Sequence, residues 1–336
     1  MGEPSQGGPM GHRSCSCGRI RRRPAEIEAM ADAVTEKGFS GILISSSGGS
    51  QAMLAPFSAM IDELSDIPWR SVLSAELVLT GCNMVDEKTL VLMTSKSGDT
   101  TETLAAARWL KERGCTIFSV IGKADSPLEE VSDFSFVYGD GRPQELIVYL
   151  FLGRLLHNAG CFDAYPTFAD ELANLVPGLV SVRKQFDARA RAYCERYHDA
   201  PYHIWVSSGD IWPTCYAYAM CVLEESQWIR TKSVSSPEFF HGTLELLEKD
   251  VPLTLLVGEG STRALDLRVK DFAEKVTDEL TVIDAAEFDM PGISAETRHW
   301  LGPVVMNAAL QRISKNMEDI TGHSLDIRRY YRKLEY

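Results

Sequence analysis

The feature that most constrains this chain is a recurrence of short apolar runs, each followed by small polar residues and a helical segment. Five such runs stand out, at residues 41–45, 89–94, 116–121, 203–208 and 251–257. Runs of this length are typical of the central strands of parallel sheets, which are buried on both faces. Their alternation with helices predicts an α/β fold with parallel sheets flanked by helices.

The same pattern restarts in the second half of the chain at a fixed offset. Ile44-Ser-Ser and Val206-Ser-Ser lie 162 positions apart. Gly98-Asp-Thr and Gly260-Ser-Thr share that spacing, with an apolar run before each. Two landmarks with one spacing predict two copies of a single α/β unit.

These copies divide the chain into two lobes. We expect a first lobe over residues 25–165, a helical connector over 166–200 and a second lobe over 201–336. Residues 1–24 are rich in Gly, Pro, Ser and Arg and offer nothing to pack. They are therefore expected to form a disordered tail.

Composition argues against several classes of function. The net charge of −13 speaks against non-specific nucleic-acid binding, which needs a basic face. No apolar run approaches the ~20 residues that span a membrane, and the first 24 residues lack a signal-peptide core, so we expect a cytoplasmic protein. The chain has eight cysteines but no paired CxxC motifs, which indicates neither a zinc site nor a disulfide scaffold. His12, Cys15 and Cys17 could suggest a metal site, but we assign them to the disordered tail.

A candidate phosphate site follows the apolar run at 89–94. Ser95-Lys-Ser-Gly-Asp-Thr100 places three hydroxyls, a lysine and a glycine between a strand end and a helix start. Open α/β sheets bind ligands at this position, and the free N–H groups of a helix N-terminus favour phosphate. The loop lacks the Gly-Lys-Ser/Thr of a nucleotide-triphosphate site. The alternative is that the loop supplies only turns and caps.

A candidate proton-transfer pair lies in the second half. An apolar helix over about 214–228 is expected to be buried and ends in Glu224 and Glu225, at least one of which is expected in a dry environment. Desolvation raises the pKa of a carboxyl group, which suits a general base. Ser235-Ser-Pro-Glu then predicts a helix start, and His241 follows Phe239-Phe240 on that short turn. The alternative is a structural helix end with a satisfied histidine.

These motifs resemble those of the sugar-isomerase (SIS) domain family. Thr94-Ser-Lys-Ser-Gly-Asp-Thr100 is similar to its Ser-x-Ser-Gly-x-Thr signature, and Ser46-Ser-Gly-Gly-Ser50 to its first loop, with Ser46 in place of a glycine. Glu225 and His241 match the proton-transferring Glu and the ring-opening His of the isomerase part of glucosamine-6-phosphate synthase. Glu238-Phe-Phe-His-Gly242 and the tail Arg328-Arg-Tyr-Tyr-Arg-Lys-Leu-Glu-Tyr336 look most like the 6-phosphofructosyl amino-acid deglycases.

The resemblance implies a tandem SIS protein that cleaves 6-phosphorylated Amadori compounds to glucose 6-phosphate and a free amine. It implies Glu225 and His241 as catalytic groups and a set of substrate-binding residues: Gly49, Ser50, Ser95, Lys96, Ser97, Thr100 and Lys333. It requires no metal, flavin or nicotinamide.

Two further classes of function stay open. One is an aldose–ketose isomerase or amino-sugar-phosphate deaminase with the same pair, and the other is a non-catalytic sugar-phosphate sensor. In the related synthase the histidine crosses a dimer interface. We therefore expect a homodimer with composite sites, in which Phe239 and Phe240 are covered by the partner; the alternative is that both phenylalanines fill the subunit's own core.

Overall fold

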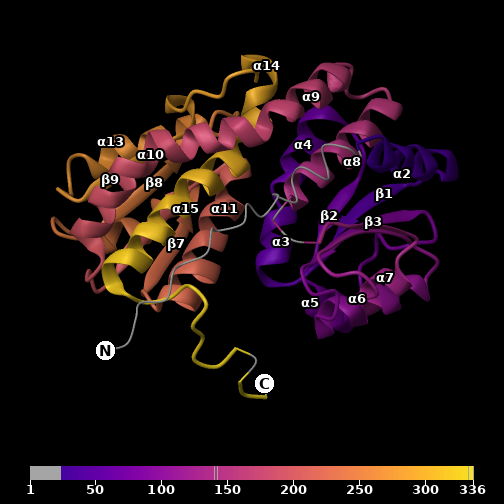
Figure 1. The fold of residues 1–336 in the computed structure, drawn as a ribbon, viewed down its shortest axis with the longest axis horizontal. Helices are drawn as coiled ribbons and strands as arrows, with labels where there is room; N and C mark the ends of the chain where they lie inside the picture. Colours follow the sequence, from indigo (N-terminus) through magenta and orange to yellow (C-terminus); the bar gives the residue numbers. More distant parts are fainter. Residues whose placement is uncertain (1–23, 140, 142, 332, 336) are drawn as a thin grey trace, which may run out of the picture.

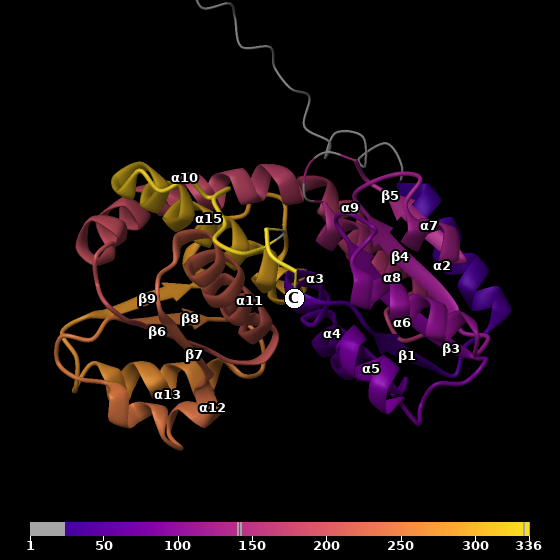
Figure 2. The same ribbon diagram turned by 90° about the horizontal axis from the view of Figure 1, so that it is seen from below.

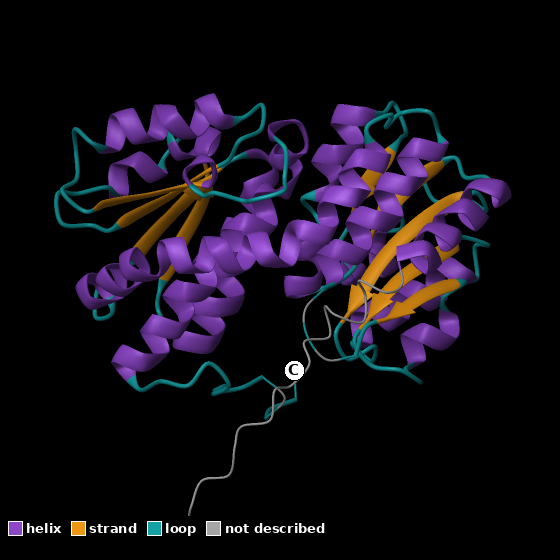
Figure 3. Cartoon of the chain, turned by 45° about the horizontal axis from the view of Figure 1, so that its top comes forward, coloured by secondary structure: helices purple, strands orange, loops and turns teal. Residues whose placement is uncertain are grey.

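The computed structural model describes residues 24–139, 141, 143–331 and 333–335, and these form two α/β lobes side by side (Figures 1 and 2). Helices flank both sheets (Figure 3). Residues 1–23 of the expected tail, with His12, Cys15 and Cys17, lie outside the described residues.

The first lobe contains a five-stranded sheet in the order β2-β1-β3-β4-β5, in which all neighbours are parallel. Its strands are β1 Gly41–Ile44, β2 Trp69–Ser71, β3 Thr89–Ser95, β4 Thr116–Ile121 and β5 Phe134–Val137. The helices of this half are α2 Pro24–Lys37, α3 Gly48–Leu54, α4 Phe57–Leu64, α5 Ser74–Thr80, α6 Thr101–Lys111, α7 Pro127–Val131, α8 Gln144–Asn158 and α9 Tyr165–Glu171.

The second lobe contains a four-stranded parallel sheet in the order β7-β6-β8-β9. Its strands are β6 His203–Ser207, β7 Thr231–Ser235, β8 Leu253–Val257 and β9 Leu280–Asp284. Its helices are α10 Leu175–Tyr197, α11 Trp212–Ala217, the π-helix η3 Tyr218–Gln227, α12 Ser236–Phe239, α13 Arg263–Ala273, α14 Ala295–Arg298 and α15 Gly302–Thr321. Short 3-10 helices lie at η1 Leu172–Asn174, η2 Gly209–Ile211, η4 Thr243–Leu246, η5 Ala285–Glu287 and η6 His299–Leu301.

The strand orders confirm the predicted duplication. β6, β7, β8 and β9 repeat the arrangement of β1, β2, β3 and β4, and the offset of 162 places Ile44 of β1 on Val206 of β6. The α/β fold with two parallel sheets is therefore as predicted.

Successive side chains of a strand point to opposite faces of its sheet, and the interior contains three hydrophobic cores. In β3, Leu90 and Leu92 face the large core that α2 and α8 cover, whereas Val91 and Met93 face a smaller core under α5 and α6. In the second lobe, α10 and α15 cover the face of the large core and α13 covers the third core. Because the large core runs through both lobes, they are packed together and not joined by a bare linker.

Polar contacts also join the lobes. Glu63 of α4 accepts hydrogen bonds from the Trp300 indole at 3.2 Å and lies 3.0 Å from His299 Nε2. The Tyr149 hydroxyl of α8 donates to the Trp300 carbonyl at 2.6 Å. These contacts hold η6, which leads into α15, against the first lobe.

Among the described residues, no helix is long and apolar enough to cross a membrane. The same part of the chain contains no group of three or more His, Cys, Asp or Glu side chains arranged to hold a metal ion.

Candidate functional site

The carboxyl ends of β1 and β3 lie side by side in the first lobe, where the strand order changes direction. Loops after such a pair of strands run to opposite faces of the sheet and leave a crevice that binds ligands. Both hydroxyl-rich loops, 46–50 and 95–100, leave the sheet at this crevice. The fold thus brings the two predicted loops together.

Hydrogen bonds connect the two loops. The Ser46 hydroxyl accepts from the Thr94 N–H at 2.9 Å and donates to the Thr94 carbonyl at 3.1 Å. The Thr103 hydroxyl of α6 donates to Ser47 Oγ at 3.2 Å. Because Ser46 is fully buried, it holds the loops in place and is not exposed to a ligand.

The side chains predicted to bind phosphate surround the N-terminus of α6. Thr100 is the N-cap, but its hydroxyl lies 3.2 Å from Ser95 Oγ and does not cap the helix. The helix dipole and first-turn N–H groups are therefore available to an anion. Ser95 is buried, Ser97 and Thr100 are half-buried, and Lys96 is exposed at the rim.

The first loop contributes the start of α3. Gly49 is exposed and Ser50 is half-buried, in the first turn of that helix. The N-terminus of a helix favours an anion, although α3 is short. The predicted binding residues of the first lobe therefore all lie at the crevice.

Gly98 is required by its backbone and by its neighbour. It adopts φ +72°, and a Cβ there would lie 2.2 Å from Ser126 Oγ. Its N–H donates to Ser95 Oγ at 3.0 Å, so any displacement of Gly98 moves a hydroxyl that is predicted to bind phosphate.

We expect Gly98→Ala to abolish the rise in Tm that glucose 6-phosphate produces in the wild type. Gly139→Ala is the matched control, because Gly139 also has φ +72° but has nothing within 4 Å of the added Cβ. Both variants carry the strain of a left-handed alanine, roughly 1–2 kcal/mol. Only Gly98→Ala displaces the loop. Thermal unfolding with and without the ligand tests this, and an unchanged ligand response in Gly98→Ala would place the phosphate elsewhere.

The second lobe repeats the crevice but fills it with a carboxylate. Asp210 follows β6 at the position that the offset of 162 aligns with Gly48. A Cβ on Gly302 or Gly258 would lie 3.3 or 3.6 Å from its carboxylate oxygens. Burial raises the pKa of Asp210 to about 6. Because a carboxylate there repels phosphate, this crevice is not a second phosphate site. The signal for Asp210 in the sequence is its alignment with Gly48 of the first copy.

The helix that carries the glutamates differs from its prediction in two ways. Its second part is a π-helix, and Tyr216 is 39% exposed, so the helix is not buried on all faces. Glu224 and Glu225 are both exposed. The expectation of a carboxylate in a dry environment is therefore wrong for the single chain, because the π-helix ends at the surface of its lobe.

The two glutamates have different partners. Glu224 accepts a hydrogen bond from the Thr231 hydroxyl of β7, in its own lobe. Glu225 forms an ion pair with Arg328 of the C-terminal tail, at 2.6 Å between Oε1 and Nε. Glu225 thus faces the tail and Glu224 faces the second-lobe sheet.

The helix that carries Glu225 also contacts the first-lobe loop at Gly49. Cys221, four residues earlier on the π-helix, has its Sγ 3.5 Å from where a Cβ on Gly49 would stand. The helices α3 and α11 pack on each other and keep this approach close. The turn of the π-helix before Glu225 therefore packs against the first loop, at the contact between the lobes.

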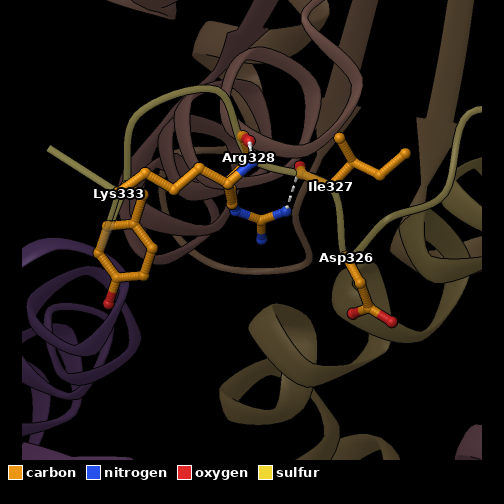
Figure 4. A pocket seen from close by; sticks show the side chains of 5 residues that line it. Asp326, Ile327, Arg328 and Lys333 are labelled. Carbon is orange, nitrogen blue, oxygen red and sulfur yellow. Dashed lines mark hydrogen bonds between the residues drawn. The ribbon is translucent and has the colours of Figure 1, made fainter.

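The tail approaches the same region. Both views show it leaving α15 and passing over the gap between the lobes (Figures 1 and 2). Its residues line an open hollow of about 600 Å³ (Figure 4): Asp326, Ile327, Arg328, Tyr331 and Lys333. The Lys333 ammonium donates to the Arg328 carbonyl at 2.5 Å. Lys333, predicted to bind substrate, is thus next to the residue that pairs with Glu225.

His241 is not brought to Glu225 within the chain. Glu225 precedes β7 and His241 follows it, and five strand residues span about 16 Å. The two residues therefore lie towards opposite ends of β7, and His241 is exposed.

The phenylalanines before His241 pack within their own lobe. Phe239 is fully buried in the third core, and its ring contacts Phe240 and Phe272. The guanidinium of Arg268 stacks on Phe240 at 4.0 Å. Phe239 therefore fills the subunit's own core, whereas Phe240 is half-buried and its contact with a partner chain stays a prediction.

Two buried polar residues missed by the sequence analysis fix the segment that carries His241. The Ser236 hydroxyl donates to Asp266 Oδ1 at 2.6 Å, and both residues are 0% exposed. Burial raises the pKa of Asp266. The predicted helix start is confirmed with Ser235 as N-cap, but its side chain makes no capping bond. The helix α12 is held by α13 at both ends.

Comparisons with known proteins agree with this architecture. Residues 40–139 match the SIS domain. The chain is 27% identical over 321 residues to fructosamine deglycase FrlB of Bacillus subtilis, covering 93% of this chain and 97% of that protein. It is 26% identical to fructoselysine 6-phosphate deglycase of Escherichia coli over 279 residues, covering 81% and 79%.

Solved structures extend the similarity to both lobes. A Bacillus subtilis protein described as a phosphosugar isomerase superposes with a TM-score of 0.89 at 26% identity, covering 93% of this chain and 97% of that one. The C-terminal domain of a Francisella tularensis glucosamine-fructose-6-phosphate aminotransferase shares the fold, with a TM-score of 0.76 at 18% identity. Residues 40–139 thus match the SIS domain, and the chain over both lobes is similar to fructosamine and fructoselysine-6-phosphate deglycases.

Proposed function

We propose that this protein is a phosphosugar enzyme of the deglycase type, which splits 6-phosphofructosyl amino acids or amines into glucose 6-phosphate and free amine. The observation that carries the proposal is the approach of Gly49 to Cys221, four residues before Glu225, because it brings the helix of Glu225 to the loop proposed to bind the sugar phosphate. The names of the deglycase relatives support the same reaction class.

In this mechanism the phosphate is held by Ser50, Ser95, Ser97 and Thr100, which leaves the sugar chain extending toward Glu225. His241 opens the ring by proton transfer at the anomeric oxygen. Glu225 takes a proton from C1 to give an enaminol, and a proton returns to C2. Water then adds to the resulting C1 imine and the amine departs. Each positioned acid or base contributes typically about 10²–10⁴-fold.

A second copy of the chain completes the site in this proposal. Glu225 and His241 lie towards opposite ends of β7, and His241 is exposed, so it is accessible to another subunit. We propose a C2 homodimer in which each site combines Glu225 of one subunit with His241 of the other.

The proposal is tested with a panel of 6-phosphofructosyl amino acids, assayed for glucose 6-phosphate release. Fructose 6-phosphate and glucosamine 6-phosphate serve as the comparison substrates. Release from the panel with little turnover of the other two is expected. Preferred conversion of fructose 6-phosphate to glucose 6-phosphate would indicate an isomerase, and ammonia release from glucosamine 6-phosphate a deaminase. Binding of sugar phosphates without turnover would indicate a sensor.

A further inference from the structure

The ion pair between Glu225 and Arg328 engages the group that the proposed reaction needs as its base. Arg328 Nε lies 2.6 Å from Glu225 Oε1, and the two side chains are 23% and 39% exposed. Hydrogen bonds to a charged group at this distance are among the strong ones in proteins. The positive charge of Arg328 partly compensates the charge of a carboxylate held this way. The carboxylate then points at the tail and not at the C1 proton of a substrate.

Arg328 is itself held by the tail. Its Nη1 donates to the Leu325 carbonyl at 2.7 Å and to the Ile327 carbonyl at 2.9 Å, and Figure 4 shows the second of these bonds. The guanidinium therefore reaches Glu225 as part of a folded segment, and not as a mobile surface side chain.

The tail is anchored on the end of the π-helix. The Trp228 ring lies 4.3 Å from the His323 ring, and the Arg329 guanidinium stacks on it at 4.0 Å. The Gln227 amide also donates to the His323 carbonyl at 3.1 Å. The two contacts of His323 thus anchor the tail, whereas Arg329 is exposed and adds only a stacked charge.

The proposed substrates carry a group that competes for Arg328. An Amadori compound of an amino acid has a carboxylate, and arginine binds carboxylates in a planar, two-point geometry. Arg328 lines the open hollow of the tail, where such a group has room.

We propose that Arg328 is a specificity-determining residue that exchanges its ion pair with Glu225 for an ion pair with the substrate's carboxylate. This proposal rests on the deglycase function above. In the unliganded chain Arg328 holds Glu225. An amino-acid carboxylate takes the guanidinium, and Glu225 is released to face C1. A substrate without a carboxylate leaves the pair closed, so it is turned over slowly even when bound.

The test compares kcat on a matched pair of substrates, the glycine and methylamine adducts of fructose 6-phosphate, which differ by one carboxylate. The wild type is expected to turn over the glycine adduct about 10- to 100-fold faster, as a charge-assisted contact allows. Arg328→Gln is expected to bring the two kcat values within about threefold by raising kcat on the methylamine adduct. If Arg328 served only folding or substrate binding, its replacement would not raise kcat on the methylamine adduct.

Two variants serve as controls. Arg329→Gln removes a neighbouring positive charge that contacts Trp228, and it is expected to keep the wild-type ratio. Arg328→Lys retains the charge but loses the two-point geometry, so an intermediate ratio is expected. It provides the test if thermal unfolding shows that Arg328→Gln does not fold.

The outcomes separate the inference from the function on which it rests. If the wild type releases glucose 6-phosphate from neither adduct, the deglycase proposal fails and the inference fails with it. If it releases glucose 6-phosphate but the ratio is unchanged in both Arg328 variants, only the inference is overturned. An equal collapse of the ratio in Arg329→Gln would assign the effect to the overall charge of the tail, and would also overturn it.

Discussion

Glu225→Gln should fold, bind sugar phosphate and lose about 10²–10⁴-fold in kcat on a 6-phosphofructosyl amino acid. The amide keeps the shape of the side chain but cannot accept the C1 proton. Because the phosphate contacts lie in the first lobe and do not involve Glu225, KM should change far less than kcat. Steady-state release of glucose 6-phosphate measures both constants.

Glu224→Gln is the matched control for this prediction. Glu224 is the adjacent carboxylate on the same π-helix and is also exposed, but it bonds Thr231 of β7 and not the tail. Removing its charge should change the activation free energy by about 0.5 kcal/mol or less, roughly twofold in rate. Equal losses in the two variants would mean that general electrostatics, and not the Glu225 carboxylate, supports turnover. Wild-type activity in Glu225→Gln would remove the mechanism.

The second large effect is recovery of activity on mixing two inactive proteins. Glu225→Gln and His241→Ala are each expected to be inactive as homodimers. After random subunit exchange half of the dimers are mixed, and each mixed dimer contains one site with both wild-type groups. Activity should therefore return to about a quarter of the wild-type value, measured as glucose 6-phosphate release.

Native mass spectrometry of the mixture supplies the control, because it measures how many mixed dimers have formed. Mixed dimers without recovered activity would show that each site takes both groups from one chain. That result would require β7 and its flanking segments to rearrange, since Glu225 and His241 lie towards opposite ends of the strand.

How well the sequence predicted the sheets depended on where each strand lies. The central strands β1, β3, β4, β6 and β8 were predicted within two residues of their bounds. The edge strand β2 was only weakly indicated, and the other edge strands β5, β7 and β9 were not predicted. A central strand is buried on both faces and gives a continuous apolar run, whereas β7, Thr-Lys-Ser-Val-Ser, has only Val234 buried.

The crevice that we propose for phosphate was predictable from local sequence as a meeting of two loops. Its hydroxyls and glycines all lie within two short loops, each placed by the strand before it, and parallel strands bring their carboxyl ends to one edge. The internal repeat was predictable for the same reason, because strand–loop landmarks keep their spacing.

The surroundings of Glu225 were decided by the tertiary structure alone. The α-helical period did not apply to η3, whose π-helical turns change which side chains share a face. Its partner Arg328 is 103 residues away in sequence, on a tail whose position depends on contacts with Trp228. Local sequence therefore determined the central strands, the loops that follow them and the identity of the chemical groups. Which groups meet was set by packing between distant segments, because such contacts leave no periodic pattern in the residues on either side.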